Sequence, residues 1–83
     1  MKPRPLVYVE IPYAGDRKKN STYLKECILE CINQGLNPYA SHAFFTQYLD
    51  DTVPVERAWG IDLGEQWRLK CEYTIFFIDL GLS

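Results

Sequence analysis

The chain has 83 residues, a formal net charge of −2, and 47% hydrophobic and 14% aromatic residues. This length allows one domain over residues 1–83, near the size at which a single core is only marginally stabilising. The hydrophobic content excludes a disordered chain, and the scattered basic residues exclude a nucleic-acid-binding stripe. The N-terminal MKPRPLVYVEIP is neither a signal peptide nor a membrane span, because its short apolar run contains Glu10.

Three cysteines stand at positions 27, 31 and 71. An odd number of cysteines without a signal peptide indicates reduced thiols and a cytoplasmic protein. Cys27 and Cys31 share a helix face, but the chain has one histidine, so we expect these cysteines to pack in the core. No metal is expected. No cofactor is expected either. The sequence contains no nucleophile elbow, phosphate-loop signature or dinucleotide glycine fingerprint.

The first half of the chain predicts a strand, a loop and a helix. LVYVEI (6–11) has bulky side chains on both faces, as in a covered parallel strand, and residues 12–20 contain Pro12 and Gly15 and are expected to form a loop. A helix follows, with Asn20 or Ser21 as its cap and Gly35 just beyond its end. Its apolar stripe consists of Leu24, Cys27, Ile28, Cys31 and Ile32.

The second half predicts a strand, a second long helix and a third strand. Residues 37–42 are expected to form a short strand, and residues 43–51 either a helical turn or an irregular lid. Pro54 suits the first turn of the long helix, with Asp51 or Thr52 as its cap. Residues 71–79 are expected to be the third strand. Alternating strands and helices predict an α/β fold with a right-handed, parallel sheet.

The second long helix has two features of its own. Val55, Trp59, Leu63 and Trp67 form an apolar stripe at i+4 spacing that winds slowly around the helix. Gly60 and Gly64 each weaken the helix by roughly 1 kcal/mol relative to alanine. Their spacing would let the helix backbone approach another segment closely.

Polar residues gather where the predicted strands end, which is where ligands bind in parallel α/β sheets. They are residues 12–16 after the first strand, Ser41 and His42 after the second, and residues 79–83 after the third. Asp50, Asp51 and Arg57 would lie above them, at the start of the second long helix. This convergence predicts a small-molecule site.

Each of these candidates also has a purely structural interpretation. Asp50 and Asp51 would cap a helix and interact with its dipole, or contact a ligand. Arg57 would pair with a neighbouring glutamate, or clamp a carboxylate or phosphate. His42 would be a hydrogen-bonded structural residue or a ligand contact, and residues 17–19 a solvated loop or a phosphate contact. Glu10 would be exposed at a strand end, or be a site carboxylate with a raised pKa.

Several motifs together resemble a known family. They are VYVEIPYAGD, Asn20, the turn over residues 35–38, SHAFF, and YLDDTVPVERAWGIDLG. The combination of PYAGD with LDDxxPxER is similar to the small Rossmann-like phage and bacterial proteins related to nucleoside 2-deoxyribosyltransferases. The resemblance covers residues 6–81. It implies a minimal three-layer, flavodoxin-like fold with a three-stranded parallel sheet of order 2-1-3 and helices on both faces.

The resemblance also implies a nucleoside or nucleotide pocket at the strand ends. Tyr8 matches a tyrosine that supports the catalytic carboxylate, and residues 12–16 match the loop beside the ribose or phosphate. His42, Asp50, Asp51 and Arg57 match the base side of the pocket. The residues expected to bind the ligand are Tyr8, Pro12, Tyr13, Gly15, Asp16, His42, Asp50, Asp51, Arg57, Asp79 and Gly81.

The chain departs from that family in its catalytic group. Ile11 stands where the family commonly has a small or polar residue, and Glu10 stands where it often has an alanine. The sequence ends before the helix that carries the family's nucleophilic glutamate. None of Glu56, Glu65 and Glu72 matches its position. We therefore expect a phage-encoded nucleoside- or nucleotide-binding protein of the host cytoplasm that sequesters or senses a nucleotide-derived molecule.

Two other functions remain open. One is a deoxyribosyltransferase or N-glycosidase in which Glu10 or Asp79 replaces the missing glutamate. The other is an oligomeric interaction module without a ligand. The strand edge at residues 73–78 would have no neighbour, so we expect a homo-oligomer formed through it. Neither nucleic acid nor a membrane is an expected partner.

Overall fold

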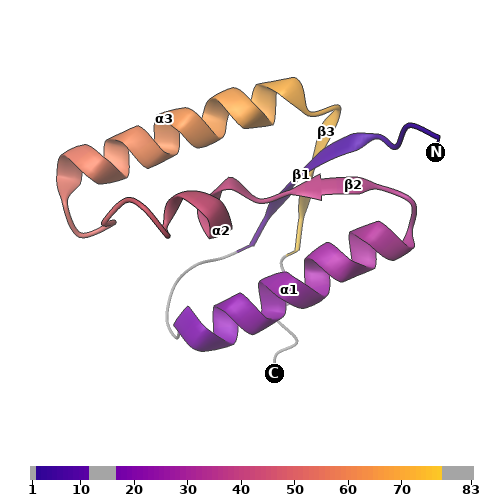
Figure 1. Ribbon diagram of the computed structural model, residues 1–83, viewed down its shortest axis with the longest axis horizontal. Helices are drawn as coiled ribbons and strands as arrows, with labels where there is room; N and C mark the ends of the chain where they lie inside the picture. The colour runs from indigo at the N-terminus through magenta and orange to yellow at the C-terminus, as the bar shows by residue number, and fades with distance from the viewer. Residues whose placement is uncertain (1, 12–16, 78–83) are drawn as a thin grey trace.

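The computed structural model describes residues 2–11 and 17–77, without the side chains of residues 17–20. Figure 1 shows the elements along the chain. They are β1 (Leu6–Glu10), α1 (Arg17–Asn33), β2 (Asn37–Tyr39), α2 (Ser41–Phe45), α3 (Pro54–Lys70) and β3 (Tyr73–Phe76). No helix among these residues is long and apolar enough to cross a bilayer.

The three strands form a parallel sheet of order β2-β1-β3, as predicted. α1 covers one face and α3 the other, so the sheet is the middle of three layers (Figure 1). In the register with β3, Tyr8 lies opposite Thr74 and Glu10 opposite Phe76. Since side chains alternate along a strand, Tyr8 and Glu10 face α3, while Val7 and Val9 face α1.

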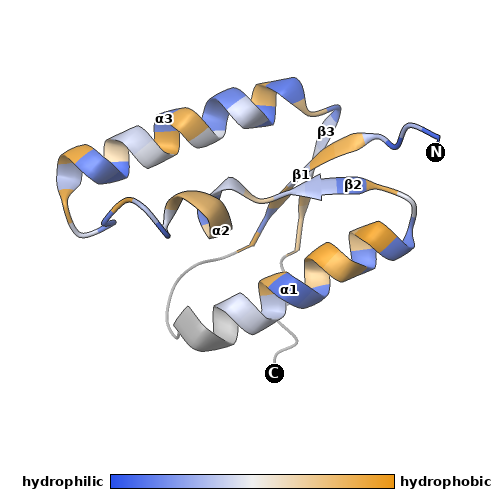
Figure 2. Ribbon diagram, in the orientation of Figure 1, coloured by the Kyte–Doolittle hydropathy of each residue, from blue (hydrophilic) through white to orange (hydrophobic). Residues whose placement is uncertain are grey.

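The core lies between β1 and α1. Val9 packs there with Leu24, Cys27 and Cys31, and Ile75 of β3 lies against this cluster. The predicted packing role of the two α1 cysteines is therefore confirmed. Figure 2 shows this apolar side of the fold as the orange stretches of α1 and β1.

α1 begins earlier than predicted and ends where predicted. It starts at Arg17, so residues 17–20 are helical and the expected loop is wrong there, as is the expected cap at Asn20 or Ser21. Residues 17–19 are Arg-Lys-Lys, which are good helix formers and extend the helix toward its N-terminus. At the other end, Gly35 has φ +84°, and the N–H of Leu36 donates to the Cys31 carbonyl at 3.0 Å. This is a Schellman motif, in which glycine takes the left-handed position without strain.

Of the two expectations for the start of α3, the position of Pro54 is confirmed and the identity of the cap is wrong. Pro54 occupies its first turn, but the N-cap residue is Val53, which makes no side-chain cap hydrogen bond. Asp50 closes the preceding turn instead, because its Oδ1 accepts hydrogen bonds from the Thr52 N–H at 2.9 Å and hydroxyl at 2.6 Å. This is the local hydrogen bonding that favours aspartate in turns.

The strands are shorter than predicted. β2 ends at Tyr39 because Ser41 begins α2, and residues 43–45 continue that helical turn. β1 stops at Glu10 and β3 covers residues 73–76. Residues 78 and 79 lie outside the described residues. Within the described part of the chain, β3 pairs with β1 alone and is an edge strand, as expected, while the oligomer predicted to form through it remains a prediction.

Candidate functional site

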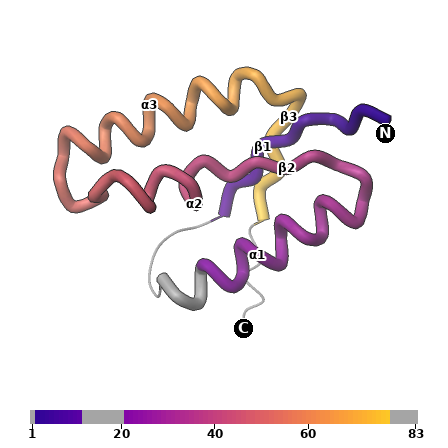
Figure 3. Tube along the Cα trace, viewed as in Figure 1, coloured from indigo at the N-terminus to yellow at the C-terminus, as the bar shows by residue number. Residues whose placement is uncertain are grey.

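A cavity of about 580 Å³ lies between α3 and the ends of β1 and β2, with α2 and the following turn as its other wall. The tube in Figure 3 shows α2 running beside α3 after the chain leaves β2. The side chains and backbone that line the cavity come from three segments. They are Tyr8, Glu10 and Ile11; Ser41, His42, Phe45, Thr46, Leu49 and Asp51; and Arg57, Gly60, Ile61, Gly64, Glu65 and Arg68.

The floor of the cavity is a buried pair of hydroxyl groups. Tyr8 and Ser41 are 6% and 5% exposed, and their side-chain oxygens share a hydrogen bond. Burial raises the pKa of Tyr8, although the hydrogen bond to Ser41 opposes the shift. The tyrosine is therefore a neutral hydroxyl at physiological pH, and it connects the sheet to the start of α2.

Gly64 lets α3 approach this floor. A Cβ at Gly64 would lie 2.6 Å from Ser41 Oγ and 3.2 Å from the Tyr8 hydroxyl, too close for a side chain. A Cβ at Gly60 would meet only Leu49 Cδ1, at an ordinary 3.6 Å. The close approach predicted from the spacing of these glycines is thus confirmed at Gly64.

One side of the cavity carries carboxylates. Glu10 lies two residues beyond Tyr8 on the same face of β1, and desolvation raises the pKa of its carboxyl group, against the opposing effect of Arg68. Arg68 also holds Glu65, with its Nε donating to Glu65 Oε1 at 2.9 Å. That hydrogen bond lowers the pKa of Glu65. Glu10 therefore retains a proton to higher pH than Glu65 does.

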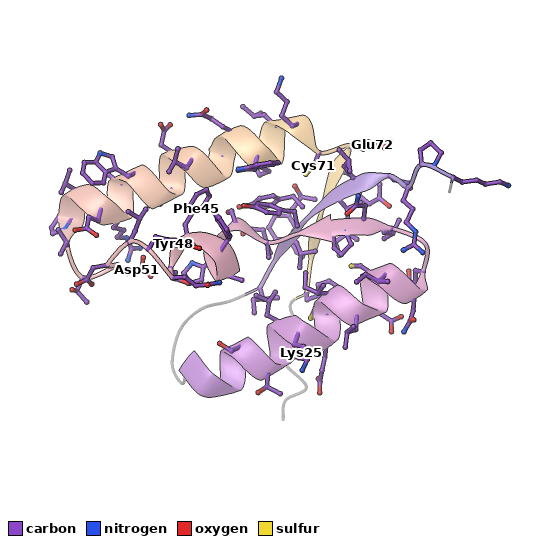
Figure 4. All side chains as sticks on the ribbon, viewed as in Figure 1. Lys25, Phe45, Tyr48, Asp51, Cys71 and Glu72 are labelled. Carbon is purple, nitrogen blue, oxygen red and sulfur yellow. The ribbon has the colours of Figure 1, made fainter. Side chains whose placement is uncertain are left out.

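The other side carries His42, Asp51 and Arg57. His42 Nε2 lies 4.0 Å from Asp51 Oδ2, and about two-fifths of each side chain is exposed. Arg57 projects from α3 at the exposed mouth of the cavity. Figure 4 shows Phe45 between α2 and α3, and Asp51 on the turn before α3. The cavity therefore has a mouth with groups of both charges, a neutral hydroxyl floor and a half-buried carboxyl group at Glu10. Among the described residues, no group of three or more His, Cys, Asp or Glu side chains could hold a metal ion.

Six of the residues predicted from the sequence meet in this cavity: Tyr8, Glu10, Ser41, His42, Asp51 and Arg57. Asp50 does not line the cavity, and its carboxylate serves the turn described above. Pro12, Tyr13, Gly15, Asp16, Asp79 and Gly81 lie outside the described residues.

Glu65 and Arg68 were not among the residues predicted to lie at this site. The signal that could have found them is spacing, because Arg57, Gly60, Ile61, Gly64, Glu65 and Arg68 stand at i, i+3, i+4, i+7, i+8 and i+11, which is one face of a helix. They form the face of α3 that lines the cavity, on which Ile61 is the one large apolar side chain. This is the less usual pattern for a helix packed on a sheet.

The parallel sheet, the helices on both faces and the cavity at the strand ends define a small Rossmann-like α/β domain. The chain belongs to the family described as "Domain of unknown function (DUF7768)", which it matches over residues 5–83. No curated protein and no solved structure matches it.

Proposed function

We propose that this protein binds a nucleoside or nucleotide in the cavity between α3 and the strand ends, and so sequesters or senses a nucleotide-derived molecule. The proposal draws on the resemblance to nucleoside 2-deoxyribosyltransferase-related phage and bacterial proteins. The single observation that carries it is a cavity of about 580 Å³ that brings three carboxylates, two arginines and a histidine together around a buried hydroxyl pair. Ligand pockets of 300–1,000 Å³ with a few convergent polar groups are typical small-molecule sites.

The chemistry of the cavity suits such a ligand. A phosphate or other anionic group would be held at the mouth by Arg57, and by His42 when it is protonated. Ribose hydroxyls would donate hydrogen bonds to the carboxylates of Glu10 or Asp51. Phe45 and Ile61 supply apolar surface for a base. The proposed setting is the cytoplasm, that of the host if the protein is phage-encoded.

Isothermal titration with a panel of nucleosides, nucleotides, and cyclic and ADP-ribose-type nucleotides tests the proposal. We expect at least one member to bind, and Arg57→Ala to weaken a phosphorylated ligand about tenfold or more, since a charge-assisted contact contributes about 1.5–3 kcal/mol. Lys2→Ala is the matched control, because Lys2 is an exposed cation near the N-terminus that does not line the cavity. Failure of every member of the panel to bind would refute the proposal.

A second candidate is an enzyme of the deoxyribosyltransferase or N-glycosidase type, with Glu10 as its catalytic carboxyl group. The observation that favours it is the position of Glu10 in the cavity, with a pKa raised by desolvation. Functional carboxyl groups are often perturbed in this way.

Incubating deoxynucleosides with a free base, followed by chromatography, tests this candidate. We expect exchange or hydrolysis that Glu10→Gln abolishes. Glu72→Gln should leave the activity unchanged, since Glu72 is exposed at the turn between α3 and β3 (Figure 4). An inert wild-type protein would exclude the enzyme and leave the binding proposal standing.

A further inference from the structure

The apolar stripe of α3 faces away from the core. Val55, Trp59, Leu63 and Trp67 are 52%, 53%, 39% and 49% exposed, although they follow one another at i+4 spacing. We call these four residues the α3 ridge. Figure 2 shows apolar and polar residues alternating along α3, and Figure 1 shows no described element above this helix. Single exposed apolar residues are normal, whereas a continuous row marks an interaction surface.

The geometry of α3 explains why this row is outside. Its inner face is fixed by Gly64, which is buried against Tyr8 and Ser41. Each step of four residues turns about 40° around a helix, so the ridge winds by roughly 120° from Val55 to Trp67. Its last member, Trp67, packs at the sheet, where the centroid of its ring lies 4.7 Å from that of the Tyr39 ring. Val55, Trp59 and Leu63 remain 52%, 53% and 39% exposed among the described residues.

We propose that the α3 ridge is the interface of a homodimer, in which α3 of a second copy packs antiparallel across a two-fold axis at Leu63. In that arrangement Leu63 meets Leu63 of the second copy, and Trp59 meets its Trp67. A two-fold interface uses the same patch on both copies, so one ridge suffices for both sides.

Charge complementarity selects the second copy and its direction. Glu56 borders the ridge near its N-terminal end, and Lys70 borders it near its C-terminal end. Antiparallel packing about Leu63 sets Glu56 of each copy opposite Lys70 of the other. Parallel packing would set Glu56 against Glu56 and Lys70 against Lys70, which is repulsive.

The available area fits a dimer of modest affinity. The four half-exposed side chains offer roughly 450 Å² per copy, and the stems of the flanking charged residues bring the total for two copies to the order of 1,000 Å². This is the lower limit for a specific interface. The nucleotide cavity lies on the inner face of α3, so a dimer formed through the outer ridge leaves both cavities open.

Sedimentation velocity of the full chain between about 1 and 200 μM tests the dimer. We expect a concentration-dependent dimer that Leu63→Glu weakens at least tenfold, because the substitution places two carboxylates at the symmetry axis. The matched control is Leu29→Glu, since Leu29 is 51% exposed on α1. It should leave the dimer unchanged. Circular dichroism reports whether each variant is folded.

A charge exchange makes the test specific for the antiparallel arrangement. Glu56→Lys and Lys70→Glu should each weaken the dimer several-fold, and the double variant should regain most of the loss. Glu56 also accepts a hydrogen bond from the Asp50 N–H at 2.8 Å. This contact is lost in Glu56→Lys and in the double variant alike, so a tighter dimer in the double variant than in Glu56→Lys reports pairing between copies.

Three results would overturn the proposal. The first is a monomer at every concentration. The second is a dimer whose affinity Leu63→Glu does not change, as pairing through the β3 edge would give. The third is a double charge variant that dimerises no more tightly than the two single variants. Titrating the ligand panel into Leu63→Glu separates this question from the proposed function, because the cavity is unchanged in that variant.

Discussion

Replacing Gly64 by alanine probes the contact that holds α3 against the sheet. Alanine improves the helix by about 1 kcal/mol at either glycine of α3. At Gly64, however, the new methyl group would lie 2.6 Å from Ser41 Oγ, so that α2, Tyr8 or α3 must shift. Overpacking of this kind costs about 1–3 kcal/mol. We expect Gly64→Ala to lower the free energy of unfolding by up to about 2 kcal/mol.

Gly60→Ala is the matched control because its methyl group would meet only Leu49 Cδ1 at 3.6 Å. It should raise the free energy of unfolding by about 1 kcal/mol. Since the helix-propensity gain is the same in both variants, the difference between them, about 1–3 kcal/mol, measures the contact at Gly64.

Urea denaturation followed by far-ultraviolet circular dichroism, at one fixed chain concentration, gives both values. A Ser41→Ala background should reduce the penalty at Gly64, because it removes the atom at 2.6 Å and leaves Ser41 Cβ at 3.4 Å and the Tyr8 hydroxyl at 3.2 Å. Equal stability of Gly64→Ala and Gly60→Ala, or a penalty that Ser41→Ala does not reduce, would refute this account of the close approach.

Three further predictions concern the titratable and hydroxyl groups. Because folding raises the pKa of Glu10, the protein loses stability as pH rises from the ordinary pKa of a glutamate through the pKa of Glu10 in the folded state. Glu10→Gln should therefore be more stable than the wild-type protein at pH 7 and equally stable below about pH 4, as measured by urea denaturation at a series of pH values. Tyr8→Phe leaves the buried Ser41 hydroxyl without its partner and should cost about 1–3 kcal/mol in the same assay, whereas adding Ser41→Ala should cost little more. Alkylation at pH 8, read by mass spectrometry, should modify the partly exposed Cys71 before the two buried cysteines of α1, although burial raises the pKa of all three thiols. Simultaneous modification would mean that α1 opens as readily as the end of α3.

The candidate site was partly predictable because parallel strands end at one edge of a sheet. Once β1 and β2 were assigned, Tyr8, Glu10 and His42 had to lie near that edge. Arg57 and Asp51 followed from the start of α3 at Pro54. Glu65 and Arg68 were not predictable in this way, because their presence depends on which face of α3 is turned inward.

The sequence by itself determined the order of strands and helices. The apolar stripe of α1, the left-handed Gly35 and the position of Pro54 each follow from local spacing or backbone preference, and alternation of strands and helices then predicts a parallel sheet. Only the tertiary structure decided the orientation of α3. The apolar stripe alone does not reveal that a glycine, Gly64, makes the closest contact with Tyr8 and Ser41, where any larger side chain would clash. That contact turns Trp59 and Leu63 outward and gives the cavity its polar wall.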